Sequence, residues 1–237
     1  IGSWNEPFHG VYDGGCRRIR GVTFSVQKNS ERFYAGLFGY SAGTLRDIVY
    51  KMNPEQAVTV AMDNGSQSLY VGALAGGNAG TIQNCAVSGI SLTGYSFGST
   101  IYVGGLVGQN TGTLAIGGCY ADCYLAGKAA AGLVGDQTGD VTLTNSYAAG
   151  FIAQDTETAA GRCLGNGKTH TRNCYSVMSY TKEDGTFYPL TQNYSANQDV
   201  YTTTFYRGEY KGFEQWGKSY GDMTDPGFAG GMGDAFG

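Results

Sequence analysis

The sequence is poor in charge, proline and histidine. Of its 237 residues, 14% are Asp, Glu, Lys or Arg, four are proline, and two, His9 and His170, are histidine. It contains no His-Glu-x-x-His motif of a zinc peptidase and no Gly-x-Ser-x-Gly elbow of a serine hydrolase. Its net charge of −4 argues against nucleic acid as a partner.

Long apolar runs are also missing. None approaches the roughly 20 residues that a membrane helix needs, so membrane insertion is not expected. No signal peptide is visible from Ile1 onward, and we interpret the chain as a mature form or as one module of a longer protein. Apolar residues make up 41% of the chain, which argues against disorder.

Glycine and tyrosine, by contrast, are abundant, with 40 and 18 residues. Glycine follows no strict three-residue period, which excludes collagen. Thr, Val and Tyr are frequent, while runs of strong helix formers are short. This composition favours many short strands joined by glycine turns.

Four segments of the chain resemble one another. They read YAGLFGYSAGTL (34–45), VGALAGGNAGTI (71–82), VGGLVGQNTGTL (103–114) and AAGLVGDQTGDV (130–141), and a degraded fifth copy, anchored on Gly165, covers 160–176. Each of the four holds two glycines with three residues between them. These glycine pairs are Gly39 and Gly43, Gly76 and Gly80, Gly108 and Gly112, and Gly135 and Gly139.

A second short pattern follows the glycines in four copies. It reads IQNCAV (82–87), IGGCYA (116–121), LTNSYA (143–148) and TRNCYS (171–176). A unit of about 30 residues made of strands and turns cannot bury its own apolar face, but stacked copies can. The sequence therefore predicts an all-β fold: a right-handed parallel β-helix of about five or six coils over residues 1–180. Residues 181–237 are predicted to form an irregular, aromatic-rich cap on it.

We expect the paired glycines to lie at coil corners. Glycine adopts positive φ angles without steric cost, and a Cβ at a corner could collide with the next coil about 4.8 Å away. Leu106 and Val107 are adjacent and cannot both face inward on a straight strand. Either Gly105 bends the chain or one of the two packs outside.

The segments GLFG (36–39) and GLVG (105–108 and 132–135), with ALAG (73–76) as a variant, resemble the GLUG motif family. The segment at 7–22 is similar to the coil that usually precedes the first GLUG repeat, and 222–236 is similar to a segment that often follows the last one. The resemblance implies a β-helix. It also implies a place in bacterial surface adhesins or in accessory regions of immunoglobulin A proteases.

Four equivalent positions carry a small side chain: Cys85, Cys119, Ser146 and Cys174. We interpret them as a slot in the interior, because free cysteine is among the most buried residue types. A disulfide between neighbouring coils and a zinc site are the alternatives. The zinc ligands would be Cys119, Cys123, His170 and Cys174. Residues four apart on a strand lie about 13 Å apart, which disfavours zinc, and no cofactor is expected.

A tyrosine follows this slot in three copies, at Tyr120, Tyr147 and Tyr175. Successive strand residues point to opposite faces, so these tyrosines point outward if the slot points inward. They then form either a stabilising ladder or a platform for sugar rings or protein side chains. Asp122, Asp136 and Asp140 are the nearest candidates for a carboxylate pair or a calcium site. The alternative is that they are solvated turn residues, because Asp136 and Asp140 bracket a glycine turn, where Asp is common for local hydrogen bonding.

The expected function is non-enzymatic. We expect an extracellular repeat module of a larger bacterial surface or secreted protein, which binds a host glycan or extracellular protein or acts as a spacer. One alternative is an accessory domain of a secreted immunoglobulin A-type peptidase, and another is a β-helix polysaccharide lyase or hydrolase. A third is a fibre subunit that self-associates through open β-helix ends. Neighbouring domains of the same chain are further expected partners.

Overall fold

The computed structural model describes most of the chain up to residue 181 and short pieces beyond it. The described residues are 1–22, 33–52, 58–62, 67–96, 100–112, 116–127, 129–153, 160–162, 165–172, 174–181, 187–189, 200–203 and 217–218. They form strands in three sheets, and no helix long and apolar enough to cross a membrane occurs among them.

Sheet A contains nine strands, in the order β1-β5-β10-β14-β17-β13-β9-β4, with β20 paired to β17. Their bounds are β1 (Val11–Asp13), β4 (Phe38–Ser41), β5 (Thr44–Arg46), β9 (Ala75–Asn78), β10 (Thr81–Gln83), β13 (Val107–Asn110), β14 (Ile116–Gly117), β17 (Val134–Thr144) and β20 (Gly165–Arg172).

Sheet B contains ten strands, in the order β2-β6-β11-β15-β18-β21-β23-β24, with β7 paired to β11 and β22 to β21. Their bounds are β2 (Arg18–Arg20), β6 (Val49–Lys51), β7 (Val58–Met62), β11 (Ala86–Ser96), β15 (Tyr120–Ala126), β18 (Tyr147–Ala153), β21 (Cys174–Thr181), β22 (Phe187–Pro189), β23 (Val200–Thr203) and β24 (Gly217–Lys218). Sheet C has the order β19-β16-β12-β8-β3, with β3 (Phe33–Ala35), β8 (Leu69–Gly72), β12 (Ile101–Gly104), β16 (Ala129–Ala131) and β19 (Ala160–Arg162).

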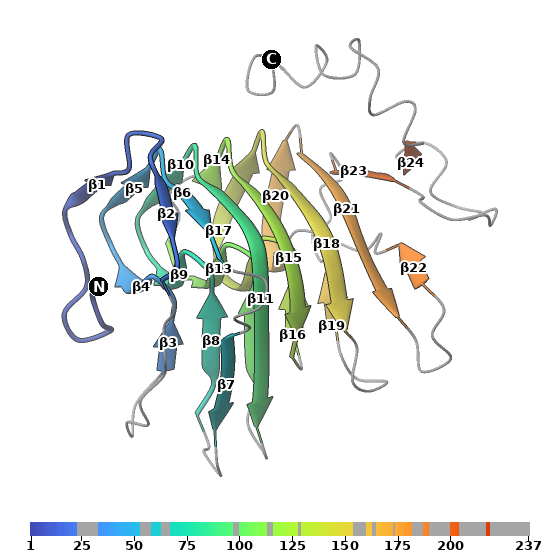
Figure 1. Ribbon diagram of the computed structural model, residues 1–237, viewed down its shortest axis with the longest axis horizontal. Helices are drawn as coiled ribbons and strands as arrows, with labels where there is room; N and C mark the ends of the chain where they lie inside the picture. The colour runs from blue at the N-terminus through green and yellow to red at the C-terminus, as the bar shows by residue number, and fades with distance from the viewer. Residues whose placement is uncertain are drawn as a thin grey trace.

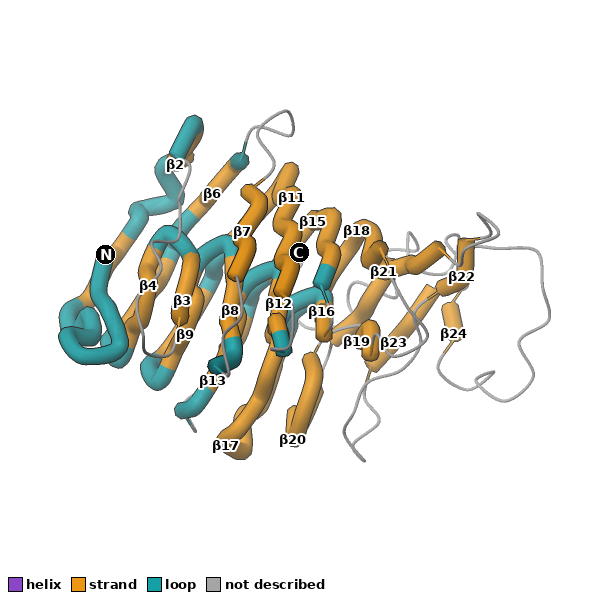
Figure 2. Tube along the Cα trace, turned by 90° about the horizontal axis from the view of Figure 1, so that it is seen from below, coloured by secondary structure: helices purple, strands orange, loops and turns teal. Residues whose placement is uncertain are grey.

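The chain visits sheets C, A and B in the same order five times, beginning at β3, β8, β12, β16 and β19 (Figures 1 and 2). We call each passage a repeat. Equivalent strands of successive repeats pair in parallel, and β21–β22 is the antiparallel pair among the described strands. The predicted all-β class with parallel strands is confirmed. The predicted cap, 181–237, lies mostly outside the described residues.

The strand register follows the second sequence pattern. Ile82 pairs with Ile116, Ile116 with Leu143, and Leu143 with Thr171. The fifth copy of the glycine pattern departs from our alignment by one residue, because Gly165 pairs with Val134 rather than with Gly135. Irregular register in this strand pair accompanies the shift.

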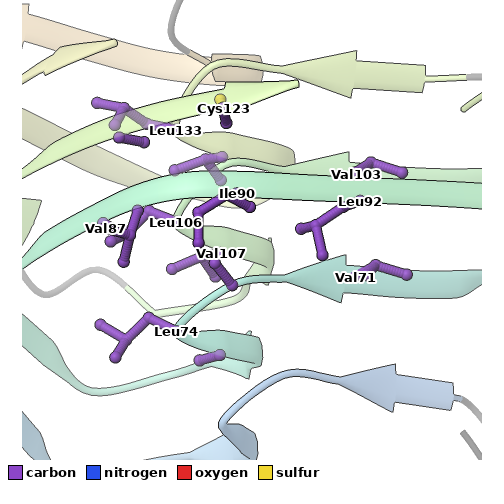
Figure 3. Close-up of a cluster of buried hydrophobic side chains, with 14 of the residues drawn as sticks. Val71, Leu74, Val87, Ile90, Leu92, Val103, Leu106, Val107, Cys123 and Leu133 are labelled. Carbon is purple, nitrogen blue, oxygen red and sulfur yellow. The ribbon is translucent and has the colours of Figure 1, made fainter. Parts of the chain in front are cut away.

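The core lies between the three sheets and is mainly apolar (Figure 3). Leu106 sits in the bend between β12 and β13, and Val107 begins β13; both side chains are fully buried. A bend at this point therefore lets two adjacent residues face inward, which is the first of the two alternatives. Leu74 and Leu133 occupy the same bend in neighbouring repeats, and backbone hydrogen bonds link it from Leu74 N–H to Leu106 O (3.0 Å) and from Leu106 N–H to Leu133 O (3.0 Å).

The positive φ angles that we expected at the paired glycines are not found, whereas the expected close approach of the neighbouring coil is confirmed. Gly39, Gly76, Gly108 and Gly135 lie inside strands of sheet A, as does Gly139, whereas bends or loops hold Gly43, Gly80 and Gly112. Apart from Gly139, whose surroundings lie outside the description, these glycines have no positive φ. They are small because backbone passes close by: a Cβ on Gly108 would lie 2.5 Å from the backbone nitrogen of Val71 and 2.6 Å from Gly76 O.

Left-handed residues do occur, at the corner between sheets A and B. In the repeats they are Asp47 (φ 52°), Asn84 (φ 51°), Gly118 (φ 63°) and Asn145 (φ 48°), and between β1 and β2 they are Gly15 (φ 55°) and Cys16 (φ 56°). Asn, Asp and Gly adopt this conformation most readily. Three of these residues immediately precede the slot in the second pattern, so the left-handed corner could have been predicted from the sequence.

Substitution of Gly108 by Ala is expected to destabilise the chain by about 1–3 kcal/mol, because the backbone that surrounds it cannot move away from the new methyl group. The shift in the urea unfolding midpoint measures this. Gly10→Ala is the control, since a Cβ there would meet only the Phe8 side chain, at 3.1 Å. Equal midpoints for the two variants would contradict the packing role of Gly108.

Candidate functional site: the aromatic outer face of sheet B

Sheet B has an inner and an outer side, because successive residues along its strands are alternately buried and accessible to solvent. In β15, Ala121, Cys123 and Leu125 are buried, while Tyr120 is half-buried and Tyr124 is exposed. Because neighbouring strands pair in register, paired residues lie on the same side of the sheet. The outer side of this sheet is therefore the place where the predicted tyrosine face must be sought.

Tyr120 and Tyr147 lie side by side on this outer face. Their backbones pair in register, and their rings stack with centroids 5.0 Å apart and an angle of 5° between the planes. The spacing of about 4.8 Å between neighbouring strands imposes this stacking. The backbone of Tyr175 pairs with Tyr147 in turn, but the side chain of Tyr175 lies outside the described residues.

A second pair of stacked rings, which our sequence reasoning missed, lies on the same face. Tyr124 and Phe151 pair in register with ring centroids 5.4 Å apart, and Tyr124 is 44% exposed. The sequence could have predicted this second pair, because aromatic residues four positions apart on a strand point to the same face of the sheet. The two ring pairs are about 13 Å apart along the strands. Asp122 lies exposed between them.

Another aromatic cluster occupies the outer corner between sheets C and A. Tyr34, Tyr70 and Tyr102 stack at 5.1 and 5.2 Å, and Trp4 stacks on Tyr34 at 5.7 Å. The middle ring is well covered, Tyr70 being 7% exposed. A Cβ on Gly77 would lie 2.6 Å from the ring of Tyr34. We interpret this cluster as packing over a glycine backbone.

A partly buried hydrogen-bond chain supports that corner. The Tyr34 hydroxyl donates to Gln109 Oε1 (2.7 Å), and Gln109 Nε2 donates to Asp136 Oδ2 (2.9 Å). Burial raises the pKa of Asp136, although the hydrogen bond from Gln109 opposes the shift. Burial also raises the pKa of Tyr102, with a smaller contribution from Asp136.

The three candidate carboxylates do not form one site in the described part of the chain. Asp122 lies on sheet B and Asp136 on sheet A, and the side chain of Asp140 is outside the description. Asp122 and Asp136 are thus on different sheets. The structure does not bring these two together as a polysaccharide lyase would require.

The small-residue slot lies at the A–B corner, inside the core. Its members are buried in each copy: Cys85, Cys119, Ser146 and Cys174. Cys119 Sγ accepts from the backbone N–H of Cys85 (3.4 Å) and donates to Gly117 O (3.2 Å). Ser146 Oγ accepts from Cys119 N–H (3.1 Å) and donates to Thr144 O (2.7 Å). The slot thus needs a side chain that both donates and accepts.

Most thiols of the described residues are shielded. Cys85, Cys119 and Cys123 are buried and form no disulfide, Cys174 is also buried, and Cys16 is exposed and forms no disulfide. Burial raises the pKa of Cys119 and of Cys123, which keeps these groups as thiols. No group of three or more His, Cys, Asp or Glu side chains comes together within the described ranges.

Replacement of Cys119 by Ser is expected to change stability little, because Ser146 makes the same two hydrogen bonds in the next repeat. Cys119→Ala should cost about 1–3 kcal/mol, since it leaves the buried N–H of Cys85 without its acceptor. Urea unfolding of both variants measures the difference. Two equally destabilised variants would show that sulfur volume matters more than hydrogen bonding.

Asp136→Asn is expected to raise the urea midpoint at pH 7 and to leave it unchanged at pH 3. The fold raises the pKa of Asp136, so the folded chain binds this proton more tightly than the unfolded chain. The resulting stability is present below the ordinary value of 3.8 and is lost as pH rises through the folded-state pKa. Asp122→Asn, on the exposed face, is the control. An Asp136→Asn variant that is less stable than the parent chain at pH 7 would contradict this reasoning.

No family model matches the chain, and no curated protein matches it. A matching solved structure, named IgA1 Protease, has a TM-score of 0.48 and 13% sequence identity, and the match covers 86% of this chain. The chain spans 17% of the length of that protein. A likeness at this level carries no argument about fold or function.

Proposed function

We propose that this chain is a non-enzymatic, extracellular module that binds a glycan or a host protein through the outer face of sheet B. The observation that carries the proposal is the pair of aromatic stacks, Tyr120–Tyr147 and Tyr124–Phe151, on one side of one sheet. Stacked rings present flat, apolar faces with polar edges, which suits sugar rings and protein side chains.

The rings are also preorganised. Tyr120 and Tyr147 are each fixed by their strand backbone and by the neighbouring ring, and both are half-buried. A side chain that is already ordered loses little conformational entropy on binding. The sheet thus holds an aromatic surface ready for a ligand, rather than one that must form around it.

We further propose that the three sheets are the faces of a right-handed parallel β-helix of the GLUG type. Repeated passage through sheets C, A and B with parallel, in-register pairing supports this architecture. The GLxG segments mark the bend between sheets C and A. There, backbones of neighbouring repeats approach so closely that a Cβ on Gly135 would lie 2.7 Å from Gly108 O.

A second role, as a module that stacks on neighbouring units, is favoured by the N-terminal edge. β1 and β2 are the end strands of sheets A and B in the part of the chain that the structure describes. Val11 is 64% exposed, while Tyr12 and Ile19 pack against the core but are only partly covered. A further unit of the same chain, or a second copy, would complete this edge.

The binding role is tested on an array of glycans and extracellular-matrix proteins. For a ligand found there, the double variant Tyr120→Ala/Tyr147→Ala is expected to lower affinity at least about tenfold, because each stacking ring contributes on the order of 1 kcal/mol. Tyr102→Ala is the matched control. Tyr102 is also half-buried and stacks on one neighbour, but it lies on sheet C.

Titration by biolayer interferometry gives the dissociation constants, and circular dichroism confirms that the variants fold. An equal loss of binding in the Tyr102 variant would contradict the assignment of the binding site to sheet B. If no ligand is found across the array, the second role, packing of this module against a neighbouring unit at its N-terminal edge, becomes the better proposal.

A further inference from the structure

Three cations gather at the N-terminal end of sheet B. In β2, Ile19 packs against the core, while Arg18 and Arg20 on either side of it are exposed. Lys51 of the neighbouring strand pairs with Arg20 and is exposed as well. The alternation of β2 and β6 therefore places all three side chains on the outer face.

These cations are not neutralised by the described residues. The ion pairs there belong to Arg46, which reaches Asp13 at 2.8 Å and Asp47 at 4.0 Å. Arg46 lies in β5, which belongs to sheet A rather than to sheet B. A positive patch is thus concentrated on one face of a chain whose net charge is −4.

The patch and the stacked tyrosines share one face and one row of residues. Arg18 pairs with Val49, Val49 with Ala86, Ala86 with Tyr120, and Tyr120 with Tyr147. From β2 to β15 there are three strand spacings, or about 14 Å. An elongated ligand lying across the strands can therefore touch the cations and the rings together.

Short side chains separate the two ends of this row. Val49, Ala86 and Ser88 are half-buried, so no large side chain of the row stands between the cations and Tyr120. The Ser88 backbone pairs with Lys51, which places a hydroxyl group beside the positive patch. Hydroxyl groups of this kind suit the hydrogen-bonding edges of sugars.

Charge also varies along the face. Its N-terminal end is cationic, whereas the exposed carboxylate of Asp122 lies beside the rings. A polyanion of uniform charge, such as nucleic acid, would be repelled at Asp122. A sugar chain with an acidic group at one end and hydroxyl groups at the other complements both ends.

We propose that this face binds an acidic oligosaccharide, with its carboxylate or sulfate group on Arg18, Arg20 and Lys51 and a sugar ring on Tyr120 and Tyr147. This inference rests on the proposed glycan-binding function and names its ligand class. Uronic acids and sulfated sugars share the required chemistry, an anion attached to a ring with hydroxyl groups.

The test uses the 237-residue chain and two matched probe pairs. One pair is a short oligosaccharide with a single terminal uronic acid and its neutral methyl ester, and the other is an oligosaccharide with a single terminal sulfate and its desulfated form. We expect the acidic member of at least one pair to bind at least about tenfold more tightly. Raising salt from about 50 to 200 mM should weaken that binding severalfold, because salt screens the attraction between exposed charges.

Variants assign the contacts. The triple variant Arg18→Gln/Arg20→Gln/Lys51→Gln should lose the preference for the acidic probe and retain the affinity for its neutral partner. Arg46→Gln, an exposed cation on sheet A, is the control and should keep the preference. Tyr120→Ala/Tyr147→Ala should weaken both members of the pair.

The outcomes separate the two proposals. Equal binding of charged and neutral probes, with sensitivity to the tyrosines alone, would overturn the acidic ligand and keep the aromatic face. No binding of any probe, together with a silent glycan and protein array, would overturn both proposals. Tighter binding of an oligothymidylate than of the acidic sugars, lost in the triple variant, would replace the sugar by a nucleic acid.

Discussion

Parallel pairing in register is the constraint on which the rest of this structure depends. It places each side chain beside its counterpart in the next repeat, at a spacing of about 4.8 Å. A side chain at one position of a repeat must therefore pack directly against the side chain at the same position of the next repeat, which is often similar. Flat rings meet this condition by stacking, as Tyr120 and Tyr147 do, and so do small side chains that donate and accept at once, as Cys119 and Ser146 do.

The same constraint explains the polar groups inside the core. Asn78 and Asn110 are fully buried, and Asn78 Nδ2 donates to Asn110 Oδ1 at 2.7 Å. Each amide also bonds the backbone two residues ahead, from Asn78 to Gly80 O and from Asn110 to Gly112 O. Buried amides are costly unless they are paired, and stacking of like on like pairs them.

Ligand recognition, as we propose it, exploits this repetition on the outer surface. A sheet edge or a loop would present single side chains, whereas a stack of repeats presents rows of them. On sheet B the row changes from Arg18 through Ala86 to Tyr120, so one straight line offers charge, small residues and aromatic rings in turn. On the corner between sheets C and A, Tyr70 is buried within a similar tyrosine stack, which we interpret as packing.

The sequence by itself determined the repeat, the strands and the register of the second pattern, because apolar alternation and recurring Cys/Ser positions are local signals. It also indicated Tyr120 and Tyr147, since their place beside the slot implied the opposite face. It further indicated that some glycines are needed where a neighbouring coil approaches, but which backbone each glycine meets was decided only by tertiary structure. Gly108 is small because Val71 and Gly76 of the preceding repeat approach it, and such an approach leaves no trace in local conformation. The shared face of Arg18, Lys51 and Tyr120 likewise depends on which strands become neighbours, and pairing between segments far apart in sequence settles that.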